Sequence, residues 1–260
     1  MSNFHSDEEI LREVRRHYKE AQAHISNLNA LGIFYYGSAN YGLDCNSSDT
    51  DTKIITIPSI QDFYCNNAPL SFVYEIENNE HINFSDIRLF FSYFKKQNIN
   101  FLEILFTKYN IINPDFLYEW ELLVSNRENI AHYDTKTAIK ATFGNMINSR
   151  KRIFTDQNNY CKHLSNIVRY DEFIMRYING FSYEECLISE NLSYLKDIRF
   201  NKLYSLEEAI ELSDNYLKHS QTMIEEYSCN DDKNKQSVDE LLASIQASVI
   251  EKSVRKELQC

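Results

Sequence analysis

Two aspartates separated by one residue, Asp49 and Asp51, are the residues best suited to chemistry in this sequence. They stand immediately before a β-branched run, Lys53 to Ile57, which predicts a strand. Side chains two positions apart in a strand point to the same face, so both carboxylates should converge in front of a sheet. Two like charges held that close require a cation, and oxygen ligands favour Mg2+, or Mn2+ in its place, completed by water and phosphates.

A glycine-serine pair, Gly37 and Ser38, supplies the other half of such a site. It directly follows the short aromatic run Ile33 to Tyr36, which predicts another strand. A glycine there lets the backbone approach a phosphate closely, and the next amides and the Ser38 hydroxyl can donate to phosphate oxygens. Gly42 would turn the chain back toward the aspartates. The pair therefore predicts a cradle for a triphosphate beside the metal site.

Each motif is weak alone, because Asp-x-Asp is most often two solvated acids and Gly-Ser is most often a loop. Their order is more informative, since the Gly-Ser pair and the aspartates fall between two predicted strands. Other phosphate and metal motifs do not fit: the sequence has no G-x-x-x-x-G-K-[ST] and no H-E-x-x-H. A calcium loop starting at Asp49 would need Gly at Ile54 and Glu at Ile60.

The segment from Gly37 to Asp51 reads G-S-x-x-x-G-L and then S-D-x-D. This arrangement resembles the nucleotidyltransferase core of the DNA polymerase beta superfamily. Within it, the segment is most similar to a bacterial and phage branch of predicted nucleotidyltransferases related to the RNA-repair-associated polymerase beta family.

Two later blocks extend the resemblance to roughly residues 30 to 210. Asn98 to Phe106 is similar to a family segment N-x-x-x-L-E-x-L-F, in which Glu103 would orient a helix or a basic partner. A weaker block comprises Lys162-His163, Arg169 and the segment Leu195 to Glu208. The family has a K-H pair, an arginine and an I-R segment leading into an acidic helix there.

The resemblance implies an enzyme that transfers a nucleoside monophosphate from an NTP, expected to be ATP, to an acceptor hydroxyl with release of pyrophosphate. The aspartates would hold Mg2+, and the Gly-Ser pair would cradle the triphosphate. An RNA end is the acceptor expected from the resemblance. A protein hydroxyl, as in adenylylating toxin and antitoxin pairs, or a small molecule would use the same core, and a non-catalytic nucleotide sensor is the alternative from another class.

Lys162 and Arg169 lie seven positions apart, on one face of a predicted helix. By resemblance they would reach the triphosphate or the base from the helical part of the chain. A solvated helical edge is the alternative interpretation of this pair. For the neighbouring His163, a structural role is the alternative to a functional one.

The third carboxylate of the resembled family is the open position of the site. Strand alternation places His81 and Asn83 on one polar face, and His81 stands where the family has an aspartate. Glu80 points the other way unless a bulge or the Asn78-Asn79 turn redirects it. Three alternatives stay open: Glu80 substitutes, His81 acts as ligand or base, or the protein binds nucleotide without turnover. A neutral imidazole suits Zn or Mn better than Mg2+.

The composition, with 43% hydrophobic and 13% aromatic residues among 260, predicts a globular chain of one large or two modest domains. A capping box at Ser6 predicts a first helix to about Asn29, and strands are expected up to Ser85. Helical patterns dominate from Asp86 onward. The predicted class is α+β, with a small mixed sheet and backing helices followed by an α-helical domain.

The expected boundaries are 1–110 for the nucleotidyltransferase-like domain, 111–228 for the helical domain, and 229–260 for a linker and a final helix. Capping boxes at Ser205 and Ser237 are predicted to open two of the later helices.

The formal charge of -11, from 38 acidic and 27 basic residues, argues against a broad phosphate-binding surface and mildly favours a protein or small-molecule acceptor. The basic clusters at Arg150 to Arg152, and at Arg88 with Lys95-Lys96, are interpreted as solvated helix faces. The six cysteines form no C-x-x-C pair and are expected to be reduced. Without a signal peptide or a long apolar stretch, the protein is expected in the cytoplasm and away from membranes. The sequence does not indicate an oligomeric state.

Overall fold

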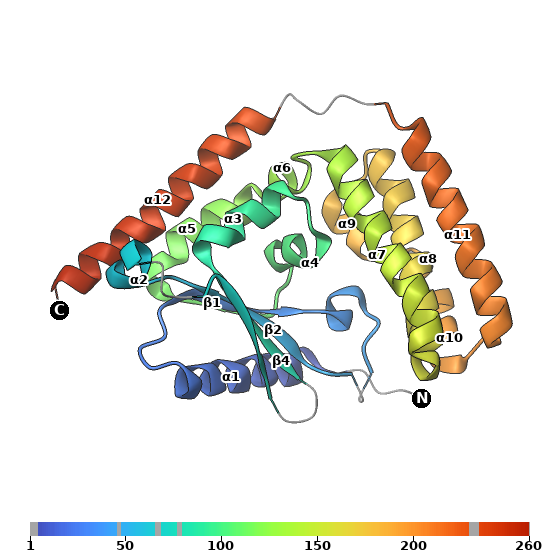
Figure 1. Cartoon of the computed structure of the whole chain (residues 1–260), viewed down its shortest axis with the longest axis horizontal. Helices are drawn as coiled ribbons and strands as arrows, with labels where there is room; N and C mark the ends of the chain where they lie inside the picture. Colours follow the sequence, from blue (N-terminus) through green and yellow to red (C-terminus); the bar gives the residue numbers. More distant parts are fainter. Residues whose placement is uncertain (1–4, 46–47, 66–68, 77–79, 229–233, 260) are drawn as a thin grey trace.

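In the computed structural model, a sheet with its helices forms the first part of the chain and helices form the second (Figure 1). The structure describes residues 5–45, 48–65, 69–76, 80–228 and 234–259. The predicted α+β class is confirmed. In the described ranges, no helix is both long and apolar enough to cross a membrane.

Within these ranges, five strands form one mixed sheet in the order β3-β4-β2-β1-β5. Their bounds are β1 Ala30–Tyr36, β2 Asp51–Thr56, β3 Ser71–Glu75, β4 His81–Asp86 and β5 Asn110–Ile112. β2 and β4 run parallel, whereas the other neighbouring pairs run antiparallel. Parallel neighbours need a crossover connection, and the segment containing α2 (Ile60–Cys65) and β3 provides it.

One face of the sheet is covered by α1 (Asp7–His24), which lies below the sheet in Figure 1. The predicted capping box is confirmed, because the Ser6 and Glu9 side chains each accept from the other's backbone N–H. Buried side chains of α1, including Val14, pack with Ile54 of β2 and Ile82 of β4. This face is therefore a closed apolar layer.

The opposite face of the sheet is covered by α3, α4 and α5. Helices α7 to α11 form the helical part of the chain beside them. α8 lies at the centre of the helical part, in contact with α7, α10 and α11. The Ser205 side chain caps the N-terminus of α11, as predicted. The helices are α3 Ile87–Lys95, α4 Ile99–Leu102, α5 Leu117–Ser125, α6 Arg127–Ala131, α7 Thr135–Thr155, α8 Tyr160–Ile178, α9 Tyr183–Leu187, α10 Leu192–Asn201, α11 Leu206–Glu226 and α12 Lys235–Gln259.

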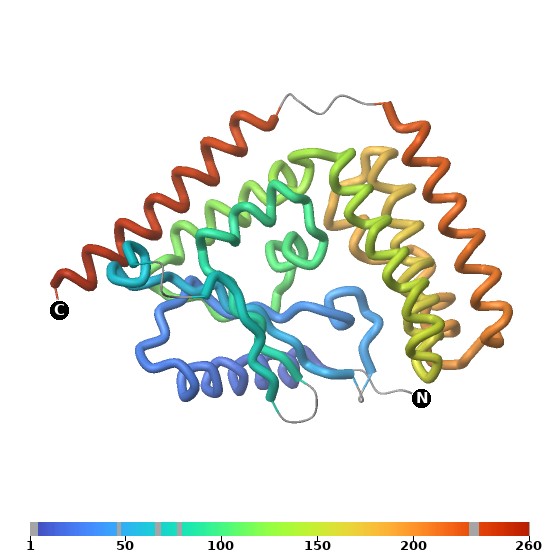
Figure 2. The backbone as a smooth tube through the Cα atoms, in the orientation of Figure 1, coloured from blue at the N-terminus to red at the C-terminus, as the bar shows by residue number. Residues whose placement is uncertain are grey.

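The last helix, α12, runs back along the first part of the chain, where it contacts α3 and α5 (Figure 2). It begins at Lys235, so the predicted cap at Ser237 is wrong: Ser237 lies in the first turn and donates to the Asn234 carbonyl at 2.9 Å. Its buried side chains recur every three or four residues, which gives one apolar stripe. This stripe joins a single apolar core that extends from the sheet to α8 and α11.

Candidate active site

The chain turns sharply directly after β1. Gly37 has φ 126° and ψ -155°, a conformation open essentially to glycine alone. A short 3-10 turn, η1 (Ser38–Tyr41), follows and ends at Gly42 with φ 67°. The backbone N–H of Leu43 donates to the Ser38 carbonyl at 3.0 Å, which closes the turn. The sequence thus provides a glycine at both positions where the backbone requires one.

Buried neighbours hold this turn in place. The Ala39 N–H donates to the Tyr35 hydroxyl at 3.1 Å, and the hydroxyl of Tyr41 donates to the carboxylate of Glu103. Glu103 belongs to the short 3-10 turn η3 (Glu103–Leu105) and is 1% exposed. Burial raises its pKa to about 8, whereas the charge of Arg169 and hydrogen bonds from the turn act in the opposite direction.

The two aspartates lie where β2 begins. Asp51 is the first residue of the strand, Asp49 stands two residues before it and outside the strand, and both line one cavity. The Asp51 carboxylate accepts from the His81 backbone N–H at 3.1 Å, and the His81 Nδ1 lies 3.2 Å from the same oxygen. Burial raises the pKa of Asp51, while its contacts with His81 act against that increase.

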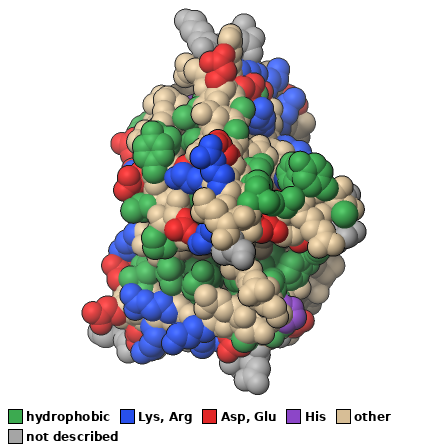
Figure 3. Space-filling view, turned by 90° about the vertical axis from the view of Figure 1, so that its left-hand side faces the viewer, with side chains coloured by type: hydrophobic (Ala, Val, Ile, Leu, Met, Phe, Trp, Pro, Cys, Tyr) green, Lys and Arg blue, Asp and Glu red, His purple; other side chains and the backbone are tan. Residues whose placement is uncertain are grey.

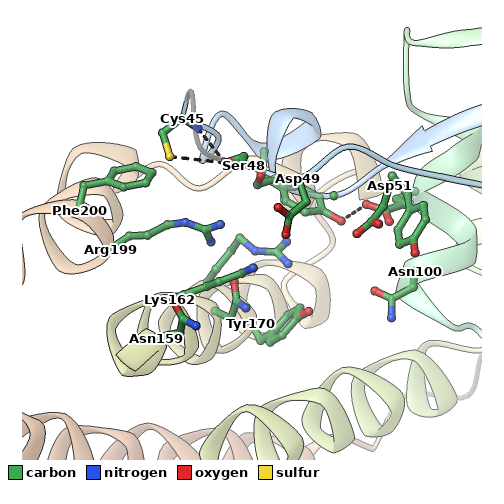
Figure 4. Close-up of a pocket in the computed structure, with 17 residues that line it drawn as sticks. Cys45, Ser48, Asp49, Asp51, Asn100, Asn159, Lys162, Tyr170, Arg199 and Phe200 are labelled. Carbon is green, nitrogen blue, oxygen red and sulfur yellow. Dashed lines mark hydrogen bonds between the residues drawn. The ribbon is translucent and has the colours of Figure 1, made fainter. Parts of the chain in front are cut away.

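The cavity has a volume of about 490 Å3 and lies between the sheet and the helical part of the chain. Its sheet side carries Gly37, Ser38 and the two aspartates. The opposite side carries three basic side chains among the described lining residues, which are Lys162, Arg169 and Arg199. Figure 4 shows Lys162 and Arg199 pointing across the cavity toward the side on which Asp49 lies.

The basic side chains differ in environment. Arg169 is 4% exposed, and its guanidinium lies 3.8 Å from the ring centroid of Tyr41 and 4.6 Å from that of Tyr170. Its Nε and Nη1 atoms have no hydrogen-bond partner among the described residues. Burial lowers the pKa of Arg199, and the nearby charge of Arg169 adds to that effect. Lys162 is exposed at the mouth. Cations gathered in this way are stabilised by a bound anion.

His81 and Glu80, the two candidates for the third group of the metal site, have different partners. His81 contacts Asp51, whereas the Glu80 carboxylate pairs with Arg16 and lies 3.3 Å from the His17 Nε2, both on α1. Because α1 covers the other face of the sheet, Glu80 is not brought to the aspartates. The Asn78-Asn79 turn that could have redirected it lies outside the described residues.

His163, in contrast, is a structural residue in this fold. It is 4% exposed, and its Nε2 lies 3.1 Å from Asp156 Oδ2. Burial lowers its pKa, although Asp156 acts against this. His163 therefore ties the start of α8 to the end of α7.

Two basic residues were not singled out in the sequence: Arg199, which lines the cavity, and Lys53, which lies next to it. Lys53 follows Asp51 by two positions, so the same alternation places it on the Asp51 face of β2. It is 4% exposed, and its ammonium lies 3.0 Å from the ring centroid of Tyr36 and 5.1 Å from that of Phe101. Burial lowers its pKa to about 7, while the charge of Asp51 acts against this. The D-x-D-x-K spacing was the available signal.

The carboxylates fit a divalent ion that is shared with a ligand. No group of three or more His, Cys, Asp or Glu side chains suited to a metal is present in the described part of the chain. Asp49 and Asp51 alone offer too few ligands for a closed protein site. Two carboxylates completed by water and phosphate oxygens are, however, the usual surroundings of Mg2+ in phosphoryl-transfer sites.

The chain matches no protein-family model and none of the curated proteins. Among solved structures, it is similar to a nucleotidyltransferase-like protein from Exiguobacterium sibiricum 255-15, with a TM-score of 0.34 and 12% sequence identity. That similarity covers 95% of this chain and 91% of the other chain. The case for a function therefore rests on the cavity and its residues.

Proposed function

We propose that this protein is a metal-dependent nucleotidyltransferase, which transfers a nucleoside monophosphate from an NTP to an acceptor hydroxyl. The proposal rests on one observation. A single cavity presents two aspartates and a glycine-serine turn on one side and basic side chains on the other. A ligand that satisfies both sides carries a metal cation and several negative charges, as an NTP bound with Mg2+ does.

The two sides of the cavity would bind different parts of the ligand. Asp49 and Asp51 would hold Mg2+, which when bound neutralises the triphosphate and aligns the attacking and leaving oxygens. The Ser38 hydroxyl and the Ser38 backbone N–H would donate to phosphate oxygens. Arg169 and Arg199 would balance the charge of the terminal phosphates from the helical side.

In the transfer step, the acceptor oxygen forms a bond to the α-phosphorus while the bond from that phosphorus to the bridging oxygen breaks. Pyrophosphate leaves with the bridging oxygen, and the hydroxyl proton passes to a base. His81 is our candidate for this base, because its ring stands beside Asp51 at the edge of the metal site. Glu80 is not our candidate, because its carboxylate lies beside His17 of α1.

The surface charges bear on the acceptor. Three of the six basic side chains in the clusters noted in the sequence form ion pairs, which are Arg88 with Asp86, Lys95 with Asp239 and Arg150 with Asp214. On the face shown in Figure 3, acidic and basic side chains are interspersed with hydrophobic ones. Long phosphate tracks need unpaired basic side chains, so these observations favour a protein hydroxyl or a small molecule over an RNA end.

Incubation with each α-labelled NTP and Mg2+ tests the proposal. We expect pyrophosphate release and label in one acceptor pool of a host extract, separated into protein, RNA and small molecules. Asp51→Ala should abolish both signals, whereas Glu20→Ala, which removes an exposed carboxylate on α1, should change neither. A wild-type protein that binds Mg2+ and NTP but releases no pyrophosphate with any pool would be a nucleotide sensor instead.

A further inference from the structure

A buried carboxylate lies beneath the phosphate-facing turn. The Tyr41 hydroxyl donates to Glu103, and hydrogen bonding from the Asn40 side chain and the Gly37 backbone lowers the pKa of the same carboxyl group, against the effect of burial. Glu103 is 1% exposed and also lines the cavity. A buried carboxylate is costly unless its oxygens are hydrogen-bonded, so this residue specifies one arrangement of the turn.

Glu103 also interacts with the helical side of the cavity. Arg169 of α8 contributes a favourable charge to Glu103, and its guanidinium packs on the ring of Tyr41 at 3.8 Å. Tyr41 thus contacts Glu103 through its hydroxyl and Arg169 through its ring face. Two guanidinium nitrogens of Arg169 keep no partner among the described residues, although the side chain is 4% exposed. These nitrogens are available to a ligand in the cavity.

We propose that Glu103 is a positioning residue that fixes the turn Gly37–Tyr41 and Arg169 relative to each other. The Ser38 backbone N–H and hydroxyl and the free guanidinium nitrogens of Arg169 can then donate to the same phosphate group. The inference rests on the proposed function for the identity of the ligand. In this proposal, Glu103 connects the two sides of the cavity without having to contact the nucleotide.

Glutamine would be a poor replacement for the ionised form of Glu103, which Arg169 and the hydrogen bonds of the turn favour. An ionised carboxylate offers two acceptor oxygens, whereas an amide offers one oxygen and an NH2 group that only donates. In Glu103→Gln, the NH2 group would face a donor of the turn, and the negative charge that attracts Arg169 would be lost. The volume of the side chain is nearly unchanged, so the substitution tests hydrogen bonding and charge rather than packing.

Calorimetric titration with magnesium tripolyphosphate and with Mg·ATP tests the inference. We expect Glu103→Gln to weaken binding of both by about 10-fold, and Tyr41→Phe to weaken it less. Glu119→Gln is the matched control, because Glu119 is 0% exposed but pairs with Lys252 on α12, outside the cavity. It should lower thermal stability and leave both affinities unchanged. In turnover assays, Glu103→Gln should raise the KM for the NTP more than it lowers kcat.

A double-mutant cycle identifies the partner. If Glu103 acts through Arg169, Glu103→Gln should have a much smaller effect on affinity in an Arg169→Ala background than in the wild type. Equal effects in both backgrounds, or wild-type affinity in Glu103→Gln, overturn the inference and leave the proposed function standing. A wild-type protein that binds neither tripolyphosphate nor any Mg·NTP overturns both.

Discussion

In the proposed reaction, His81 lies beside Asp51 and accepts the proton of the acceptor hydroxyl. His81→Ala should abolish transfer and leave Mg·NTP affinity within about threefold, because the imidazole contacts Asp51 without approaching the basic wall. Glu80→Gln should keep transfer and lower the free energy of unfolding by about 1 kcal/mol, since Arg16 and His17 lose a partly exposed partner. Single-turnover assays and urea denaturation measure the two effects. Loss of transfer in Glu80→Gln with a stable fold would reverse the assignment.

Ser38 tests the phosphate cradle itself. Ser38→Ala removes one donor that faces the cavity, so NTP binding should weaken by about 0.5 to 3 kcal/mol, as expected for a hydrogen bond to a charged group. The melting temperature should fall only slightly, because the Tyr35 hydroxyl, which also hydrogen-bonds Ser38, keeps the Ala39 N–H as a partner. Identical affinity together with a large drop in melting temperature would show that Ser38 is structural.

The residues of the sheet side were predictable, and those of the helical side only in part. Strand alternation placed His81 on the polar face and Glu80 on the other, and the same rule would have placed Lys53 beside Asp51. The contribution of Arg199 depends on how α10 packs against the turn, which is a long-range contact. Local periodicity carries no information on such contacts.

At the scale of elements, the turn after β1 is the most demanding structure in the site. Gly37→Ala should lower the free energy of unfolding by about 1 to 3 kcal/mol, because its backbone lies in a region nearly closed to other residues. The added methyl group itself has room, since its closest neighbour is the Tyr35 hydroxyl at 3.5 Å. The cost is therefore one of backbone conformation.

Gly144→Ala provides the control for Gly37→Ala. Gly144 lies inside α7, and a Cβ atom there would meet nothing within 4 Å. Alanine favours a helix over glycine, so this substitution should raise the free energy of unfolding by about 0.5 to 1 kcal/mol. Chemical denaturation of both variants gives the comparison. Equal stability changes of the same sign would contradict the strained conformation of Gly37.

Elements with strong local signals were predicted well. The capping boxes at Ser6 and Ser205 are confirmed because their hydrogen bonds form within one turn of the helix. The strand Asn110–Ile112 was missed, since three residues show no clear alternation and its pairing partner, β1, is far away in the sequence. The Ser237 box failed because α12 starts two residues earlier.

At the scale of the whole molecule, one apolar core joins the sheet to the helical part. It includes Phe34 of β1, Trp120 of α5, Tyr177 of α8 and Leu242 of α12. α12 also forms polar contacts with the first part of the chain. In one of them, Lys252 Nζ donates to Glu119 Oε2 at 2.9 Å. The course of α12 could not be predicted, because an amphipathic helix indicates that it packs but not against which surface.

A shared core predicts that both parts of the chain unfold together. Leu242→Ala removes a side chain that is 1% exposed, and a buried leucine replaced by alanine typically costs about 2 to 5 kcal/mol. Trp120, the single tryptophan, stacks near Phe34 with ring centroids 4.6 Å apart, so its fluorescence reports on the part around the sheet. Far-ultraviolet circular dichroism reports mainly on the long helices. Both signals should shift to lower urea concentration by the same amount in Leu242→Ala and coincide in each protein. If the fluorescence transition moved alone, α12 would stabilise only the part around the sheet, and the two parts would be independent folding units.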